Sequence, residues 1–398
     1  MTLEIRPAEQ GEMEEFARVA GTNLAFPSEW FRGMPPERTL CAFVDGKLAT
    51  SYGAWPLRMR LNGRKAGVAG VTMVGTMPPY RRQGQLRAIT AAHFKRLYEE
   101  RAEPVAALFA SLAAIYQRFG YGVVSSQLAY RVEPRYIDFV QPLPLAGRLR
   151  ESSPVELPLL ENLYLRFIER RTGYLERDES RWRGTLFPPA DGGATLNFAV
   201  YEEGGDPQGY AIYEITRFHE QRPGPYQRLT VRDFIWLTPS AYQALWQCFA
   251  RFDLVSEVSC FRLPPDDPLM HLVQEPRMLQ AVCRDGLLGR IVDVERALPL
   301  RRYDAEGLLV FRLRDDLCPW NDGVWELESV GDEAVVRRTE RPAELTLPVS
   351  TLAMLLFGQI SATRAAEMGR LDVHDHAGLS AWDTIMATAV PPFCADIF

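Results

Sequence analysis

The chain has 398 residues, of which 47% are apolar, 24% charged and 11% aromatic, and its formal net charge is −6. These values are typical of a soluble globular protein of two or three domains, and the acidic balance argues against general nucleic-acid binding. The charge is uneven, because residues 1–140 contain 18 Lys and Arg against 13 Asp and Glu. This pattern favours an anionic ligand in the basic part and a cationic one elsewhere.

The sequence contains no apolar run of the roughly 18–20 residues that a membrane helix needs. Its N-terminal stretch MTLEIRPAEQGEMEEF is acidic and does not resemble a signal peptide, so we expect no membrane insertion and a cytoplasmic protein. The cysteines are scattered without CxxC or zinc spacing, and reduced, mostly buried thiols are expected. They are Cys41, Cys248, Cys260, Cys283, Cys318 and Cys394.

The first 140 residues predict a mixed α/β domain. A short strand over 3–6 and a helix over 9–20 precede three strands, which Asp45-Gly46 and Asn62-Gly63 join as hairpins. An amphipathic helix follows over 84–100, then a buried strand over 104–110 and a short helix over 112–119. A last strand over 125–134 is expected to close this domain.

The Pro-rich stretch 141–160 is interpreted as a linker. After it, a helix over 157–171, three strands, a helix over 239–250 and a further strand repeat the order of the first domain without its arginine-glycine junction. A third block with several short strands and two helices begins near residue 288. The predicted domains are therefore 1–145, 146–287 and 288–398.

The junction between strand and helix at residues 75–90, GTMPPYRRQGQLRAIT, has features of a phosphate site. A helix N-terminus offers backbone N–H groups and partial positive charge, Gly84 permits close approach, and Arg81 and Arg82 add charged donors. Pro78 and Pro79 end the strand, so its exposed backbone could pair with an amide-bearing ligand. A pyrophosphate joined to an amide-containing arm is coenzyme A.

This stretch resembles motif A of the GNAT N-acetyltransferases, Gln/Arg-x-x-Gly-x-Gly/Ala, with Leu86 in place of the usual Gly or Ala. It is similar in this respect to the Eis (enhanced intracellular survival) family, which carries Arg-Arg-x-Gly-x-Leu. SLAAIYQRFGYG (111–122), RIVDVERAL and DDLCPWNDGVWEL are also similar to stretches of that family. The resemblance implies an α+β chain with two tandem GNAT-type domains, the second without cofactor, followed by a sterol-carrier-protein-like domain.

The resemblance further implies acetyl-CoA as the acetyl donor and assigns residues to it. The backbone N–H near Val74 would polarise the thioester carbonyl, and Val74 and Thr76 would pair with the pantetheine arm. The implied donor-binding residues are Val74, Gly75, Thr76, Arg81, Arg82, Gln83, Gly84, Gln85, Leu86 and Ser111.

Two residues would carry the proton transfers. Tyr116 is placed where GNAT enzymes present a tyrosine to the thioester sulfur, and its phenol would protonate the departing thiolate. In the Eis family the C-terminal carboxylate returns to the first domain as general base, and the final residue is aromatic. The ending PPFCADIF is apolar enough to dock, so Phe398 is the expected base.

A cationic amine is the expected substrate. Phe26, Glu29 and Trp30 cluster in LAFPSEWF, where aromatic faces and a carboxylate suit an ammonium group, although an ordinary packed aromatic loop is the alternative. Eis relatives acetylate aminoglycosides, some accept lysine side chains, and they assemble as hexamers, so a homo-oligomer is implied. The stretch DVHDH (372–376) offers two histidines without an evident third ligand, and no metal site is expected.

Three functions are therefore distinguished. The first is N-acetyl transfer from acetyl-CoA to primary amines of polycationic small molecules such as aminoglycosides. The second is acetylation of protein lysines or polyamines by the same site. The third is a non-enzymatic lipid or sterol carrier built on the last domain, which has no need of the arginine-glycine junction.

Overall fold

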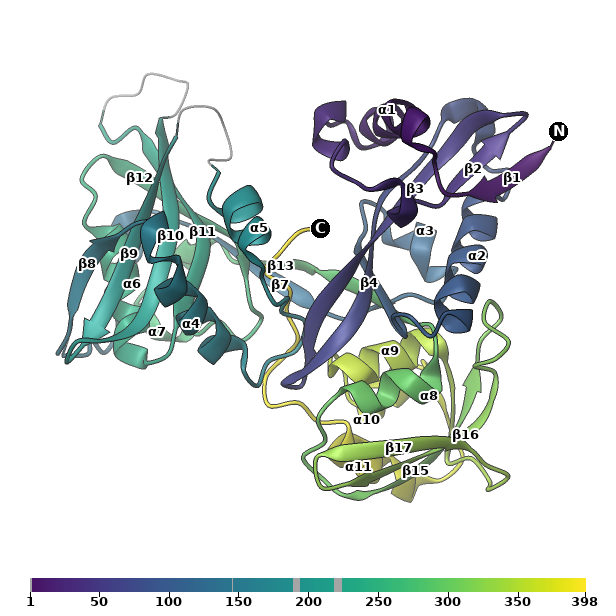
Figure 1. Cartoon of the computed structure of the whole chain (residues 1–398). Coiled ribbons are helices and arrows are strands. Elements are labelled where there is room, and N and C mark those ends of the chain that lie inside the picture. Colours follow the sequence, from purple (N-terminus) through teal and green to yellow (C-terminus); the bar gives the residue numbers. More distant parts are fainter. Residues whose placement is uncertain (1, 145, 189–193, 218–223) are drawn as a thin grey trace. The chain divides into compact units, whose positions relative to one another are not determined.

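The computed structural model describes residues 2–144, 146–188, 194–217 and 224–398 (Figure 1). Contacts divide the chain into two compact units. The first consists of Met1–Ser125, Gly286–Thr388 and Asp396–Phe398, and the second of Ser126–Asp285 and Ala389–Ala395. No helix in the described part of the chain is both long and apolar enough to cross a membrane.

The first unit contains a seven-stranded sheet in the order β1-β2-β3-β4-β5-β14-β6. Its strands are β1 (Leu3–Arg6), β2 (Cys41–Val44), β3 (Lys47–Leu61), β4 (Arg64–Thr76), β5 (Val105–Phe109), β14 (Leu287–Ile291) and β6 (Gly122–Val123). The two predicted hairpins are confirmed. Asp45-Gly46 and Asn62-Gly63 all have positive φ, between 46° and 90°, as a type I′ turn requires.

Helices α1 (Met13–Leu24) and α2 (Gln85–Glu99) cover opposite faces of this sheet. Successive residues of β2 point to opposite faces, and Phe43 packs with Phe16 of α1 whereas Ala42 packs with Ile89 of α2. Helix α3 (Ala113–Gln117) follows β5. The helices predicted over 9–20, 84–100 and 112–119 are thus confirmed, although residues 10–12 form the separate 3₁₀ turn η1 (Gln10–Glu12).

The second unit has its own seven-stranded sheet, in the order β13-β7-β12-β11-β10-β9-β8. Helices α4 (Leu157–Ile168) and α6 (Pro239–Ala250) pack on it, while α5 (Glu179–Arg181) and α7 (Leu269–Leu272) are short. The strands are β7 (Ser126–Val132), β8 (Arg148–Ser152), β9 (Thr195–Glu203), β10 (Asp206–Arg217), β11 (Gln227–Trp236), β12 (Val255–Leu263) and β13 (Val282–Asp285).

The two sheets have the same strand order, and each contains the strand that follows an edge strand of the other sheet in sequence. β14 follows β13 in the chain but lies antiparallel between β5 and β6. β7 follows β6 in the chain but lies antiparallel between β12 and β13. The prediction that strand 125–134 closes the first sheet is therefore wrong. The local pattern identified strand β7 correctly. Its pairing with β12 and β13 depends on residues that are distant in sequence. The stretch 141–160 also contains β8, so it is not a plain linker.

The last block forms a five-stranded sheet in the order β17-β16-β15-β18-β19 within the first unit. Its elements are α8 (Val294–Ala297), β15 (Gly307–Arg314), β16 (Gly323–Val330), β17 (Glu333–Arg338), β18 (Leu345–Pro348), α9 (Val349–Phe357), α10 (Ala362–Glu367), β19 (Asp372–Val373) and α11 (His376–Ile385). Helix α9 is buried on all sides and packs against β14, where a Cβ on Gly289 would come 3.3 Å from Phe357. The boundaries 145/146 and 287/288 remain predictions.

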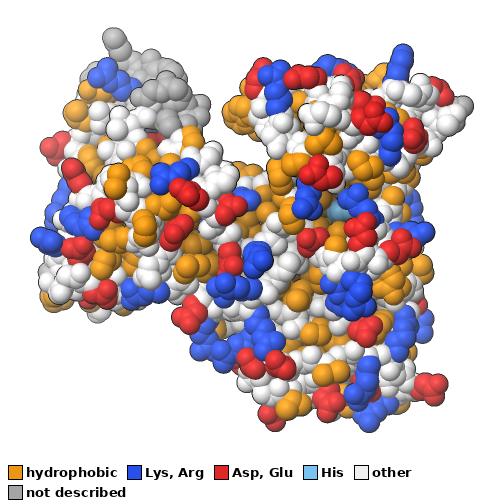
Figure 2. Space-filling view, in the orientation of Figure 1, with side chains coloured by type: hydrophobic (Ala, Val, Ile, Leu, Met, Phe, Trp, Pro, Cys, Tyr) orange, Lys and Arg blue, Asp and Glu red, His pale blue; other side chains and the backbone are white. Residues whose placement is uncertain are grey.

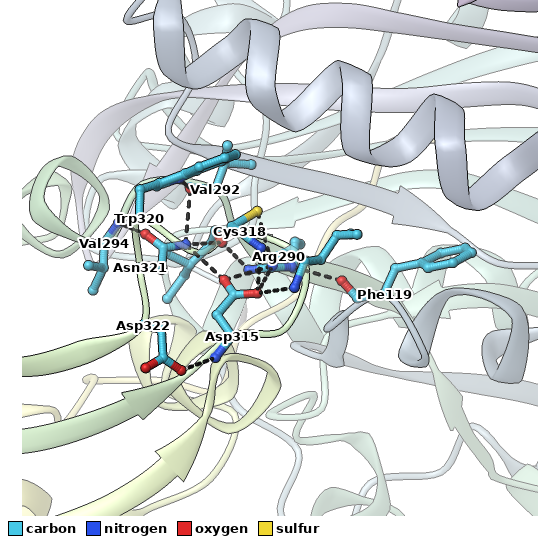
Figure 3. Close-up of polar contacts among 11 residues, drawn as sticks. Phe119, Arg290, Val292, Val294, Asp315, Cys318, Trp320, Asn321 and Asp322 are labelled. Carbon is cyan, nitrogen blue, oxygen red and sulfur yellow. Dashed lines mark hydrogen bonds and ion pairs between the residues drawn. The ribbon is translucent and has the colours of Figure 1, made fainter.

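A buried ion pair joins this block to the first sheet (Figure 3). The Arg290 guanidinium donates to both oxygens of Asp315, at 2.6 and 2.8 Å, and to the carbonyl of Phe119 at 2.9 Å. Asn321 donates to the same carboxylate at 2.9 Å. Both charged side chains are fully buried, so each depends on the other for its solvation. Phe119 closely follows α3, and the pair therefore also fixes the end of that helix.

Figure 2 shows acidic, basic and apolar side chains interspersed on the face that it presents, rather than gathered into fields of one sign. The six cysteines are free thiols, four of them buried. His374 of the DVHDH stretch contacts the hydroxyl of Thr346 through Nε2 at 2.8 Å. Among the described residues, no group of three or more potential ligands could hold a metal ion.

Candidate active site

The centre of the first sheet opens where β4 and β5 diverge. These parallel strands pair only over Val68–Gly70 and Val105–Ala107, yet β4 continues to Thr76 and β5 to Phe109. Beyond Ala107, β5 stays paired with β14. The edge of β4 after Gly70 is therefore separated from β5, and an extended amide-bearing molecule could pair with it.

A β-bulge lies on the diverging part of β4. Thr72 pairs with Gly53 and Gly75 with Ser51, so Met73 and Val74 together face Tyr52. Met73 has φ of 56°, which is rare for a residue with a side chain, and its carbonyl accepts the Ser51 hydroxyl at 2.8 Å. A bulge re-aims backbone groups, and this one lies at the residue whose N–H was predicted to polarise the thioester, Val74.

The loop between β4 and α2 exposes backbone at the start of the helix. Arg82 and Gly84 both have left-handed φ, 62° and 89°, and a Cβ built on Gly84 meets nothing within 4 Å. The first N–H groups of α2 have no partners inside the helix. Left-handed turns at this point direct the loop backbone toward open space, which suits an anionic group.

Among the predicted donor-binding side chains of the loop, Arg81 and Gln83 bond to the protein itself, whereas Arg82 is exposed. Arg81 donates to the Thr76 carbonyl at 2.9 Å and to Asn23 of α1 at 2.8 Å, so its guanidinium holds the loop to the end of β4. Gln83 donates to the carbonyl of Pro79.

The remaining predicted positions lie on either side of the sheet. A Cβ on Gly75 would come 2.6 Å from Asn23, so this glycine permits α1 to approach β4. Leu86 is half-buried and packs on the core beneath α2, which explains an apolar residue where the motif usually has Gly or Ala. Gln85 is buried, and Ser111 is exposed after β5.

Tyr116 lies on α3, and its side chain packs on the same apolar core as Ile89 and Phe94 of α2. Its ring packs edge-on against Tyr121 at 6.0 Å between centroids, and burial raises the pKa of its phenol to about 12. A phenol in this environment stays protonated at neutral pH and can act as a proton donor.

The ring of Phe398 packs at the divergence of the two strands. Its centroid lies 5.5 Å from that of Phe109 at the end of β5, and a Cβ on Gly70, at the last parallel pair, would come 3.0 Å from its Cδ2. The structure thus places the ring of Phe398 beside the diverging strands, and its role as a base remains a prediction.

The comparisons with known proteins agree with this arrangement. Two family models, both described as "Acetyltransferase (GNAT) domain", match residues 4–124 and 173–291, and one described as "Sterol carrier protein domain" matches residues 294–395. An uncharacterized N-acetyltransferase of Streptomyces avermitilis is 32% identical over 90% of this chain and 88% of its own length. N-acetyltransferase Eis of Mycobacterium tuberculosis is 30% identical over 87% of this chain and 88% of its own.

The chain belongs to the Eis family of GNAT N-acetyltransferases. The structure of Eis1 from Mycobacterium abscessus, 28% identical, covers 99% of this chain and all of that one with a TM-score of 0.83. A GCN5-related N-acetyltransferase from Anabaena variabilis, at 23% identity, shares the fold with a TM-score of 0.88 over both whole chains. The predicted fold class, two GNAT-type domains and a sterol-carrier-like domain, is confirmed, and the chain is an acetyltransferase.

The aromatic residues predicted to bind substrate are exposed in this Eis family member. Phe26 and Trp30 are 51% and 66% exposed, and their rings stack at 5.2 Å between centroids. Trp30 and Glu29 lie on the 3₁₀ turn η2 (Ser28–Phe31), directly after α1. Phe26 and Trp30 are therefore not part of the core, whereas the adjacent Phe31 is buried against Ala17 and Ala20 of α1.

Sequence reasoning missed a buried pair beneath the site. The Tyr52 hydroxyl contacts Nδ1 of His93 at 2.8 Å, and burial lowers the pKa of His93 to about 3, so its imidazole is neutral. Tyr52 faces the bulge of β4, and His93 lies on α2. The polar position of His93 on an otherwise apolar helix stripe was visible in the sequence, but its partner was not.

Proposed function

We propose that this protein transfers the acetyl group of acetyl-CoA to a primary amine of a polycationic small molecule such as an aminoglycoside. The observation that carries the proposal is the divergence of β4 from β5 after Gly70, next to a helix whose entry loop has left-handed φ at Arg82 and Gly84. The open strand edge suits the amides of the pantetheine arm. The N–H groups at the start of α2 suit a pyrophosphate.

The residues present fit that donor. Open space around Gly84 permits a phosphate to approach the backbone, and exposed Arg82 adds positive charge. The side-chain amide of Gln85 donates to the side-chain oxygen of Gln83, so these side chains bond to each other. Gln83 and Gln85 would therefore contact the donor through their backbone N–H groups. When bound, acetyl-CoA supplies an activated acetyl thioester.

Two groups of this chain serve the proton transfers. The carboxylate of Phe398, which requires Phe398 to be the last residue, accepts a proton from the substrate ammonium so that the amine nitrogen can attack the acetyl carbon. Tyr116 donates its phenolic proton to the leaving sulfur. Because its pKa is raised to about 12, the half-buried phenol of Tyr116 keeps this proton at neutral pH. The N–H at Val74 stabilises the charge that develops on the carbonyl oxygen.

The amine is recognised by an exposed aromatic and acidic surface. The Phe26–Trp30 stack presents ring faces to solvent, and Glu29 lies beside it in the sequence. Cations bind to such faces by cation–π attraction, and a carboxylate adds charge pairing. Protein lysines and polyamines carry the same ammonium group and are the alternative substrates. By its resemblance to the Eis family, we also propose that the chain forms a homo-oligomer such as a hexamer.

The test is a thiol-release assay with acetyl-CoA and a panel of aminoglycosides, polyamines and lysine peptides. We expect aminoglycosides to give the largest kcat/KM, and a preference for polyamines or peptides would replace them as the substrate class. If no amine stimulates thiol release, the proposed transfer is wrong.

The role of Phe398 is tested by appending two glycines to it. The longer chain should bind coenzyme A with unchanged affinity but lose at least about 100-fold in kcat, because the carboxylate is displaced. The matched control is Ile397→Ala, which alters an exposed neighbour and keeps the terminus. Full activity in the extended chain would contradict the role of the carboxylate.

A further inference from the structure

The second unit contains a pocket of about 640 Å³ that the acetyl transfer does not use. This volume is within the roughly 300–1,000 Å³ of small-molecule sites. The pocket lies among the end of α4, the end of β11, the start of α6 and the segment after β12. Its lining consists of Gln141, Leu143, Arg166, Phe167, Arg171, Trp236, Leu237, Thr238, Pro239, Tyr242, Gln243, Pro268 and Leu272.

The pocket occupies the position in the second sheet that corresponds to the opening in the first. β11 pairs in parallel with β12 only through Val231, and then continues to Trp236 beside β10 alone. Helix α6 begins at Pro239 just beyond, as α2 begins beyond β4. Two strands that diverge next to a helix N-terminus thus form a cavity here as well, and its occupant depends on the residues that line it.

The entry to α6 does not suit a pyrophosphate. One residue, Leu237, separates β11 from the N-cap Thr238, and the Thr238 hydroxyl already accepts the N–H of Ala241 at 3.1 Å. Pro239 at the first helical position has no N–H. Two of the backbone donors that a phosphate would use, at Pro239 and Ala241, are therefore absent or occupied at this junction.

Aromatic rings form the wall of the pocket. Trp236 lies 4.9 Å from Phe167 and 4.9 Å from Tyr242 between centroids, both at steep interplanar angles. Tyr242 is fixed because its hydroxyl donates to the buried Asp267 at 2.8 Å. Rings held at such angles present both faces and edges, which favours a flat aromatic guest over a flexible chain.

The charge in the lining has one sign. The charged residues among the described ones that line the pocket are Arg166 and Arg171. The Arg171 side chain is mostly buried, with its guanidinium 4.1 Å from the Phe167 ring, and its NH1 contacts both oxygens of Asp266 at 3.1 Å. Asp266 and the aromatic face hold Arg171 in place. Arg166 lies at the rim with its guanidinium 4.0 Å from Asp206. Neither of these carboxylates lines the pocket, so the lining itself is complementary to an anion.

Size, aromatic walls and positive charge together define a ligand class. We propose that this pocket binds an aromatic carboxylate of one or two rings, with the rings against Trp236 and Tyr242 and the carboxylate toward Arg171 and Arg166. Gln243 supports the rim, because it bonds to the backbone of Gln141 and Leu143 through both ends of its amide. This binding is independent of acetyl transfer.

The experiment is isothermal titration calorimetry of the full chain with 2-naphthoate. Naphthalene-2-methanol, 2-naphthylmethylammonium and octanoate serve as neutral, cationic and flexible comparisons. We expect one saturable site for 2-naphthoate, and at least tenfold weaker binding for each comparison, because each lacks either the charge or the ring. No saturable binding of 2-naphthoate, or equal binding of the neutral or cationic analogue, would overturn the proposal.

Variants locate the site. Arg171→Met keeps an apolar stem and should weaken 2-naphthoate binding at least tenfold, and Arg166→Met, at the exposed rim, should weaken it about threefold. Arg170→Met is the matched control, since Arg170 is exposed and does not line the pocket, and it should leave binding unchanged. If Arg171→Met does not fold, Arg166→Met decides. Unchanged binding in the folded variants would contradict this site.

Discussion

The two GNAT-type sheets have the same strand plan but differ at the junction that follows the long central strand. In the first, a loop with left-handed Arg82 and Gly84 leads into α2. In the second, the single residue Leu237 separates β11 from the N-cap of α6. There the Thr238 side chain accepts an N–H of the first turn, and Pro239 has no N–H to offer. The difference shows that topology supplies the diverging strands, while a few junction residues decide which ligand the opening suits.

The largest expected effect concerns the buried ion pair that each unit contains. Arg290 pairs with Asp315 in the first, and Arg177 with Asp233 at 2.6 Å in the second. Arg290→Met and Arg177→Met should each lower the free energy of unfolding by about 3–5 kcal/mol, because each leaves a carboxylate buried without its cation. Segment-resolved hydrogen exchange would measure this loss.

The double variant Arg290→Met/Asp315→Leu is the control for this prediction. It removes both charges and should recover part of the lost stability, because the N–H groups of Leu317 and Cys318 still lose their acceptor. A loss below about 1 kcal/mol in Arg290→Met would show that the pair contributes no more than a surface one.

The next effect concerns Tyr116, which has no tyrosine counterpart on α7 (Leu269–Leu272) after β12. Tyr116→Phe should lower kcat about 100- to 1,000-fold with the KM for acetyl-CoA unchanged, because it removes the proton donor and keeps the ring. Steady-state kinetics would measure both constants. Tyr98→Phe, on exposed α2 surface, is the control, and a KM change in Tyr116→Phe would indicate a binding role instead.

Asp267 makes the stability of the second unit depend on pH. Burial raises the pKa of this carboxyl from 3.8 to about 6, so the folded chain binds the proton more tightly than the unfolded chain. Stability that is present below pH 4 is therefore lost as the pH rises through about 6. Asp267→Asn should raise the free energy of unfolding by up to about 3 kcal/mol at pH 8 and leave it unchanged near pH 4, as two pK units imply.

Denaturant unfolding at the two pH values would measure this difference. Asp266→Asn is the matched control, because Asp266 is paired with Arg171 and its loss should not stabilise the protein. An equal gain for Asp267→Asn at both pH values would contradict titration as the cause.

The smallest effect compares two glycines with the same backbone. Gly84 and Gly205 have φ of 89° and 88°, and a Cβ on either meets nothing within 4 Å. Alanine at either position should cost about 1 kcal/mol of stability. Only Gly84→Ala should also raise the KM for acetyl-CoA, by about tenfold, because the loop backbone approaches phosphate there. Equal KM values in the two variants would separate Gly84 from donor binding.

Local sequence signals determined much of the first sheet. Asp45-Gly46 and Asn62-Gly63 identified both hairpins, because their turns are specified by two residues. The exchange of β7 and β14 was not predictable in this way, since pairing of residues 105–109 with 287–291 depends on packing across the whole chain. The same limit hid the partner of Arg290.

Residue type alone indicated Gly84, because a left-handed turn before a helix favours glycine. The places of Tyr116 and Phe398 were implied by the family resemblance, and their roles remain predictions. The bulge at Met73 was hidden, because a positive φ is ordinarily a property of glycine and no sequence signal marked it here. The hydrogen bond from Arg81 to Asn23 could not be predicted from the sequence, because the two residues come together only in the folded chain.

The place of β14 between β5 and β6 has a consequence for how the protein is made. A nascent chain that has emerged only as far as residue 285 contains all strands of the first sheet except β14. The place between β5 and β6 is then empty. The whole second segment is therefore synthesised before the first sheet can be completed. Synthesis to at least Ile291 is therefore needed to complete the first sheet, and a chain truncated before β14 should remain an open, aggregation-prone intermediate.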